Sequence, residues 1–163
     1  MSSEAMIQGS VKERIDRWIS HYPADQKVSA VMPALRIVQE ENGGYLTTEL
    51  MNEVAAYLDM RPIAVYEVAT FYSMYEHKPV GKHKLALCTN ISCMLRGSDE
   101  ILEYLEKKLG VHVGEVTEDG LFSIKKVECL GACGGAPAMM VGKDYYENLT
   151  EASVDELLEA LAK

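Results

Sequence analysis

The chain has 163 residues, of which 48% are hydrophobic and 25% are charged, and these values are typical of a folded globular protein. Its formal net charge of −9 argues against nucleic acid as a partner, because an acidic surface repels phosphate backbones. The longest uncharged stretch, residues 129–142, is broken by glycines and a proline, so we expect no helix that spans a membrane. The first residues, Met1–Glu4, lack a basic and apolar leader, so we expect no secretory signal and a cytosolic protein with reduced cysteines.

The N-terminal half predicts a bundle of four short helices. Ser10 and Glu13 have the spacing of a capping box, and apolar residues at helical spacing follow them as far as Pro23. Asn-Gly-Gly at 42–44 is a helix stop, and Pro62 suits the first position of a helix. The helices are expected at residues 10–22, from between Ser29 and Met32 to about 42, at 48–58, and from 62 to about 71.

The pattern changes around Pro79, and we place a boundary there between residues 1–80 and 81–163. The C-terminal half has the order strand, helix, strand, strand, helix, which indicates a sheet of about four strands packed on helices. These elements are expected at 84–88, 98–109, 122–127 and 138–141, with a last helix opened by a capping box at Ser153 and Glu156. The predicted fold class is therefore α+β.

Four cysteines are the most informative feature of the sequence. Cys88 and Cys93 are spaced C-x4-C, Cys129 and Cys133 are spaced C-x3-C, and each pair follows a predicted strand. The two pairs converge if the two strands are neighbours in the sheet, and four convergent thiolates in a reducing compartment indicate a metal site. Glycines in the second loop, at 131, 134 and 135, allow backbone N–H groups to approach anionic sulfur closely.

Other interpretations of the cysteines are open from spacing alone. Four unrelated buried thiols are one, but two regular pairs at loop entries disfavour it. A structural zinc site with four thiolates suits the spacing almost as well as an iron–sulfur cluster. Disulfides are disfavoured in a reducing compartment, and the C-x-x-C of a thioredoxin-type redox motif is absent.

The cysteine spacing, with the residues around it, resembles that of the thioredoxin-like [2Fe–2S] ferredoxin family. Within this family, it is most similar to the branch that forms the E component of NADH–quinone oxidoreductase, respiratory complex I. The similarity covers residues from about 15 to 161, and Ser92 departs from it where many members have proline, at a position that supplies no ligand. The segments that carry it are residues 88–97, 119–122 and 129–133, with Leu130-Gly131 and Pro137, and upstream residues 42–45, 67–72 and 79–81.

The resemblance implies an N-terminal helical bundle followed by a thioredoxin-like [2Fe–2S] ferredoxin domain. It implies that Cys88, Cys93, Cys129 and Cys133 ligate one [2Fe–2S] cluster, with no catalytic residue in this chain. It further implies an electron-transfer subunit of an NADH-oxidising complex, peripheral at the inner face of the membrane. FMN and NADH would be bound by a larger partner subunit, which carries out the hydride step.

Two alternatives remain at this point. The equivalent subunit of an NAD-reducing hydrogenase or NAD-dependent formate dehydrogenase shares the cysteine frame, and a zinc-stabilised interaction module belongs to a different class. The sequence has no G-x-G-x-x-G or P-loop, so we do not expect the isolated chain to be catalytic. Eight of the twelve aromatic residues lie in the helical half, more than four short helices are expected to bury, so we predict that this half is a docking arm.

Overall fold

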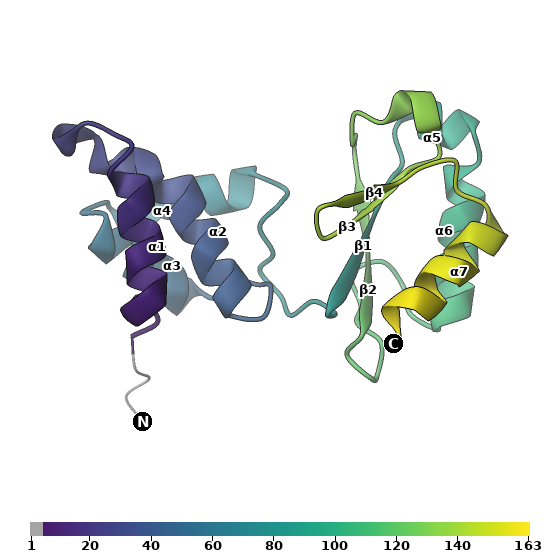
Figure 1. The fold of residues 1–163 in the computed structure, drawn as a ribbon, viewed down its shortest axis with the longest axis horizontal. Helices are drawn as coiled ribbons and strands as arrows, with labels where there is room; N and C mark the ends of the chain where they lie inside the picture. The colour runs from purple at the N-terminus through teal and green to yellow at the C-terminus, as the bar shows by residue number, and fades with distance from the viewer. Residues whose placement is uncertain (1–4) are drawn as a thin grey trace. The chain divides into compact units, whose positions relative to one another are not determined.

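The computed structural model describes residues 5–163, and the chain divides after Pro79 into two compact units, which are described separately. Residues 1–4, on which the expectation of no secretory signal depends, lie outside the described residues. The first unit is helical (Figure 1). Its elements are α1 (Gly9–Ile19), the 3-10 helix η1 (Ala24–Ala30), α2 (Val31–Glu41), α3 (Thr48–Tyr57) and α4 (Pro62–Phe71).

The helical unit has its own apolar core. The largest side chains in this core that are shielded from solvent come from α1, α2, α3 and α4 and from the loops that follow α2 and α3, and they are Ile15, Leu35, Val38, Leu46, Val54, Leu58 and Val65. The expected positions of the second, third and fourth helices are confirmed, and Pro62 opens α4 as predicted. The 3-10 helix η1 was not predicted, because its sequence has no clear helical periodicity.

The capping box expected at Ser10 and Glu13 is wrong. The helix begins at Gly9, and its N-cap is Gln8, two residues before Ser10, with no side-chain hydrogen bond. The carbonyl oxygen of Gln8 accepts hydrogen bonds from the backbone N–H groups of Val11 and Lys12, so Ser10 lies inside the first turn of the helix rather than at its N-cap.

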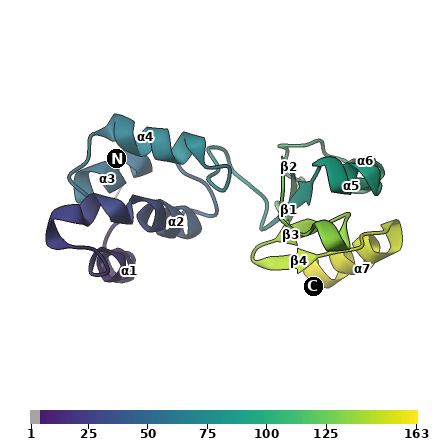
Figure 2. The ribbon, with the colours of Figure 1, turned by 90° about the horizontal axis from the view of Figure 1, so that it is seen from above.

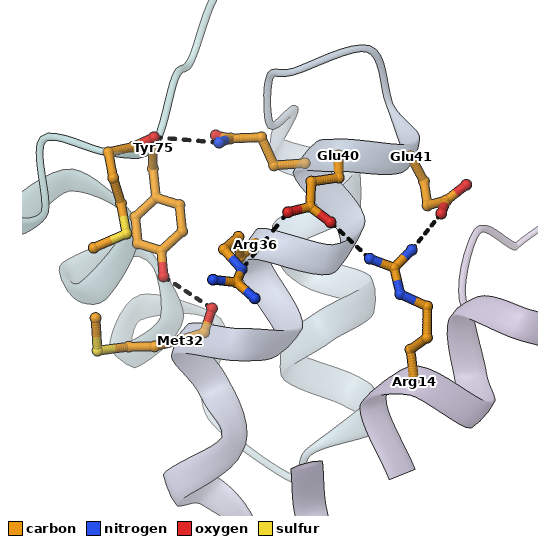
Figure 3. Close-up of polar contacts among 8 residues, drawn as sticks. Arg14, Met32, Arg36, Glu40, Glu41 and Tyr75 are labelled. Carbon is orange, nitrogen blue, oxygen red and sulfur yellow. Dashed lines mark hydrogen bonds and ion pairs between the residues drawn. The ribbon is translucent and has the colours of Figure 1, made fainter. Parts of the chain in front are cut away.

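Polar contacts tie the segment after α4 and helix α1 to α2 (Figure 3). Tyr75 donates its phenolic hydrogen to the carbonyl oxygen of Met32 at 2.9 Å. On the other side of α2, Arg14 forms ion pairs with Glu40 at 2.6 Å and Glu41 at 2.5 Å, and both carboxylates are exposed. These contacts connect residues far apart in the sequence within the helical unit.

The second unit, Val80–Lys163, contains one mixed sheet and three α-helices. The strand order is β2-β1-β3-β4; β1 is parallel to β2 and antiparallel to β3, which is antiparallel to β4. The elements are β1 (His83–Cys88), α5 (Ile91–Leu95), α6 (Ser98–Leu109), β2 (Phe122–Val127), the 3-10 turn η2 (Cys133–Gly135), β3 (Met139–Val141), β4 (Asp144–Tyr146) and α7 (Glu151–Leu161).

Helices α6 and α7 cover one face of this sheet, as Figure 2 shows. Leu85 and Leu87 of β1 are fully buried in the core cluster that includes Leu105 of α6, and Ala86 between them is buried as well. With the four-helix unit before it, this arrangement confirms the α+β prediction. Among residues 5–163, no helix is both long and apolar enough to cross a membrane.

One expectation for this unit is wrong, and two short elements were not predicted. The last helix begins at Glu151, and its capping box joins Thr150 and Ser153, whose side chains and backbone N–H groups bond reciprocally at 2.9 and 3.2 Å. Ser153 is therefore the third helical residue rather than the N-cap, because the chain turns helical three residues earlier than predicted. Helix α5 and strand β4 were not predicted, since five and three residues are too short to show a period.

Candidate metal centre

The two cysteine pairs begin at the same edge of the sheet. Cys88 is the last residue of β1, and its register partner Val127 is the last residue of the parallel neighbour β2, two residues before Cys129. Parallel neighbours end at the same edge, so both cysteine-bearing loops start side by side. The condition set by the sequence, that the two strands be neighbours, is therefore met.

Short helical segments carry the second cysteine of each pair. Cys93 lies in α5, whose N-cap Asn90 accepts a 2.7 Å hydrogen bond from the backbone N–H of Ile91. Cys133 is the first residue of η2. Cys88 and Cys93 are buried, whereas Cys129 and Cys133 are exposed, and all four are free thiols.

Small side chains surround the buried pair. Cys88 and Cys93 pack with Ala136 and Ala138 in a cluster separate from the main core, with partly buried Val127, Leu130 and Ala132 at its border. Ala138 accepts a 3.0 Å backbone hydrogen bond from the N–H of Cys88, so the end of the second loop is fixed beside the end of β1. Alanine and glycine leave the backbone accessible to the sulfur atoms.

Backbone N–H groups favour negative charge on sulfur at this edge. Burial by itself raises the pKa of Cys88, but hydrogen bonds from the N–H groups of Asn90 and Leu130 and from the thiol of Cys93 outweigh it and lower that pKa. Burial raises the pKa of Cys93, and the hydrogen bond to Cys88 and the charges of Cys88 and Cys133 raise it further. The pKa of Cys88 is thus lowered and that of Cys93 raised within one hydrogen-bonded pair.

One of the two exposed cysteines, Cys129, also meets a backbone donor. The N–H of Gly131 donates to Sγ of Cys129 at 3.4 Å, and Gly131 has a φ of +74°, a left-handed conformation that glycine adopts without strain. Of the three loop glycines predicted to let backbone amides approach sulfur, Gly131 does so here. The second loop therefore has the features that stabilise anionic sulfur.

The structure brings the four predicted ligands together only in part. Cys88 and Cys93 are hydrogen-bonded partners, and Cys133 is close enough for its charge to act on Cys93. Over residues 5–163, no set of three or more His, Cys, Asp or Glu side chains converges in a metal-binding arrangement. The donor set itself, four free thiols at one sheet edge with amides directed at two of the sulfurs, fits a thiolate-ligated iron–sulfur cluster.

Contacts between the second loop and the segment after β4 were not predicted from the sequence. The N–H of Asn148 donates to the carbonyl oxygen of Gly135 at 2.6 Å, and the N–H of Leu149 donates to that of Pro137 at 3.1 Å. A Cβ built on Gly135 would lie 2.2 Å from Oε2 of Glu147. The only sign of this contact in the sequence is that two glycines, Gly134 and Gly135, follow Cys133.

The chain is similar in sequence to curated subunits of NADH-quinone oxidoreductase. The chain is 46% identical over 151 residues to the NADH-quinone oxidoreductase subunit designated E 2 in Rhizobium meliloti (strain 1021), and the match covers 93% of this chain and 88% of that protein. It is 45% identical over 141 residues to the NADH-quinone oxidoreductase subunit designated E in Rickettsia felis, covering 86% and 84% respectively.

The fold is also found in a solved structure of an NAD+-reducing [NiFe]-hydrogenase in the air-oxidized state. The TM-score is 0.68 at 18% identity, and the match covers 81% of this chain but only 22% of the hydrogenase chain, so the similarity concerns the fold alone. The sequence pattern of one family matches residues 15–162, nearly the whole chain. By this match, and by its 46% identity to a curated relative, the chain belongs to the thioredoxin-like [2Fe–2S] ferredoxin family.

Proposed function

We propose that this chain is an electron-transfer subunit that holds one [2Fe–2S] cluster through Cys88, Cys93, Cys129 and Cys133. The observation that carries the proposal is that two parallel neighbouring strands deliver both cysteine pairs to one sheet edge, where backbone N–H groups meet sulfur. The cluster, when bound, supplies one-electron redox chemistry. The chain's own residues supply thiolates, amide hydrogen bonds and a small-residue pocket around the buried pair.

The complex proposed for this subunit is the NADH-oxidising module of NADH–quinone oxidoreductase, peripheral at the inner face of the membrane. The names of relatives at about 45% identity support it. A partner subunit would bind FMN and NADH and carry out the hydride step, since the sequence of this chain has no nucleotide-binding loop. The isolated chain would then not oxidise NADH.

The cluster is tested by purifying the full chain without oxygen. We expect a red-brown protein with about two irons and a visible absorption spectrum, because this cluster type contains two irons bridged by sulfide. Stoichiometric zinc in a colourless protein would refute the cluster and favour the zinc-stabilised module.

Substitution of an exposed cysteine tests the ligand set without disturbing the core. Cys129→Ser should remove most of the iron and visible absorption, because an alkoxide is a poorer soft-metal ligand than a thiolate, while the free energy of unfolding of the metal-free chain stays unchanged. Ser92→Ala, beside Cys93 but not a proposed ligand, is the matched control. Equal iron content in Cys129→Ser and Ser92→Ala would remove Cys129 from the ligand set.

The partner is tested by isolating the complex from the native source. Co-purification with an FMN- and NADH-binding subunit and quinone-linked subunits is the expected result. Co-purification with hydrogenase or formate dehydrogenase subunits would assign the chain to the alternative assembly. Flavin-dependent NADH oxidation by the pure chain alone would contradict the division of labour between the two subunits.

We further propose that the helical unit docks onto the flavin-carrying partner. Three apolar side chains at the end of α4 remain accessible: Phe71 is 80% exposed, and Tyr72 and Met74 are 38% and 47% exposed. The rings of Phe71 and Tyr72 meet edge to face with centroids 5.1 Å apart. Exposed aromatic residues grouped in this way are typical of interface centres.

The docking role is tested with the full chain carrying Phe71→Ala. Because the side chain is exposed, we expect an unchanged free energy of unfolding and cluster content, with an affinity for the partner at least about tenfold lower. Tyr145→Ala, an exposed aromatic of the second unit, is the control. If Phe71→Ala binds the partner as tightly as the unmodified chain, this patch has no docking role.

A further inference from the structure

The side chain of Glu147 lies against Gly135. Gly135 is two residues after the proposed ligand Cys133. A Cβ at Gly135 would meet Oε2, Cδ and Cβ of Glu147 at 2.2, 2.5 and 2.6 Å. Both the carboxylate and the Cβ of Glu147 thus lie against Gly135. Any side chain at residue 135 would displace the carboxylate of Glu147. Because glycine has no side chain, this negative charge can lie against the second cysteine loop.

The backbone fixes Glu147 at this place. Tyr146, the residue before it, pairs with Met139 in the β3–β4 ladder, and Asn148, the residue after it, donates to the carbonyl oxygen of Gly135 at 2.6 Å. Both neighbours are therefore hydrogen-bonded to the segment that runs out of the second cysteine loop. The side chain is exposed, but its backbone is not free to move away from the loop.

The sheet also places Glu147 near the first cysteine pair. Leu87, Met139 and Tyr146 are register partners in the successive strands β1, β3 and β4, and β1 and β4 run in the same direction. With neighbouring strands ~4.8 Å apart, the backbone of Tyr146 lies about 10 Å from that of Leu87, across Met139 of β3. The residues that follow these two, Glu147 and Cys88, therefore leave the sheet at the same end, and the carboxylate of Glu147 lies against the second cysteine loop at Gly135.

We propose that Glu147 lowers the reduction potential of the cluster held by these loops, an inference that rests on the function proposed above. Reduction adds one electron, and so one negative charge, to a group already surrounded by thiolates. A carboxylate fixed nearby repels the added charge and so favours the oxidised form. Glu147 is thus a potential-setting residue rather than a ligand, and Gly135 is the residue that admits it.

The test is a redox titration of the full chain followed by electron paramagnetic resonance. Glu147→Gln keeps the shape of the side chain and removes its charge. At a fixed applied potential we expect the ratio of reduced to oxidised cluster to rise about two- to fourfold, as for a partly solvated charge at this distance. The rise should shrink as salt is added, because ions screen an exposed carboxylate, whereas a change caused by altered packing would not depend on salt.

Two further variants make the result specific. Glu147→Asp keeps the charge on a shorter side chain and should give a ratio between those of the unmodified chain and Glu147→Gln. Asp144→Asn removes an exposed carboxylate from the opposite end of β4 and should leave the ratio unchanged.

The outcomes separate this inference from the proposed function. A chain with normal cluster absorption whose ratio is the same in Glu147→Gln and the unmodified chain overturns the role of Glu147 alone. An equal rise in Asp144→Asn also overturns it, because the effect would then belong to the net charge of the chain. A chain that binds no cluster overturns the proposed function and this inference with it.

Discussion

The hydroxyl of Tyr75 donates a 2.9 Å hydrogen bond to the carbonyl oxygen of Met32, which lies 43 residues earlier in the chain. Tyr75 is only 4% exposed, so the segment after α4 is held by a buried ring and a hydrogen bond at once (Figure 3). The side-chain amide of Gln39 supports the same segment by donating to the carbonyl oxygen of Met74 and accepting from the N–H of Glu76. The last loop of the helical unit is therefore part of its core.

Removing the hydroxyl of Tyr75 tests this hydrogen bond. Tyr75→Phe should lower the free energy of unfolding by about 1 kcal/mol, because the carbonyl oxygen of Met32 loses a partner while the ring stays buried. Urea denaturation followed by circular dichroism measures the change. Tyr145→Phe, at a 52% exposed position, should change it by less than about 0.5 kcal/mol, and an equal loss in both variants would contradict the assignment.

Tyr75 also predicts a loss of stability at alkaline pH. Burial raises the pKa of Tyr75 to about 12, against 10.0 for an ordinary tyrosine. The folded state thus keeps a proton that the unfolded state releases, so this contribution is complete below pH 10 and is lost as the pH rises through 12. Between pH 9 and about 11.5, unfolding measurements should show a smaller loss of stability in Tyr75→Phe than in the unmodified chain. Parallel curves for the two proteins would show that Tyr75 titrates as an ordinary tyrosine.

The two capping predictions lead to opposite expectations for two similar residues. Thr150→Ala should lower the free energy of unfolding by about 1 kcal/mol, because the backbone N–H of Ser153 loses its acceptor at the start of α7. Ser10→Ala should have almost no effect, since Ser10 lies inside α1 rather than at its cap. Thermal or urea unfolding of both variants distinguishes the two cases. The sequence pattern, with a cap at Ser10, predicts a loss of stability in Ser10→Ala, whereas the structure predicts that loss in Thr150→Ala.

Gly81 is a position where no side chain fits. An added Cβ would lie 2.4 Å from the backbone carbon of Phe122, and the N–H of Gly81 donates to Oγ of buried Ser123 at 3.1 Å. Gly81→Ala should therefore lower the free energy of unfolding by about 1–3 kcal/mol through overpacking. Gly134→Ala is the matched control, because a Cβ there meets nothing within 4 Å. Comparable losses in the two variants, measured by urea denaturation of the metal-free chain, would refute this reason.

The ion pairs of Arg14 should contribute little despite their short distances. Arg14 and its partners Glu40 and Glu41 are each about 40% exposed, so water and salt screen their attraction. Arg14→Met should lower the free energy of unfolding by less than about 1 kcal/mol, and by still less in 1 M salt. A loss above about 2 kcal/mol that is independent of salt would mean that the arginine acts through packing instead.

Local signals were sufficient where an element is long and its boundary residue is chemically distinct. Pro62 opens α4 and the Asn-Gly-Gly stop at 42–44 ends α2 as predicted, because these residues restrict or free the backbone at their own positions. The capping boxes were misplaced because the spacing of serine and glutamate occurs both at true caps and one turn inside a helix. Only the backbone of the preceding residues distinguishes the two cases.

Short elements and partners distant in the chain could not be predicted in the same way. Strand β4 has three residues, and it exists because β3 offers it a ladder of hydrogen bonds. Glu147 reaches Gly135 for the same reason, since the β3–β4 pairing returns the chain to the second cysteine loop. Neither relationship leaves a spacing pattern in the sequence.

The sequence by itself determined the residue types, the C-x4-C and C-x3-C spacings and the order of the longer helices and strands, because these depend on groups within a few residues of one another. The tertiary structure alone decided that β1 and β2 are parallel neighbours, which of the thiols are buried, and which carboxylate lies against the ligand loop. These relationships depend on how the sheet pairs strands from distant parts of the chain, a choice governed by the packing of the whole unit rather than by any local segment.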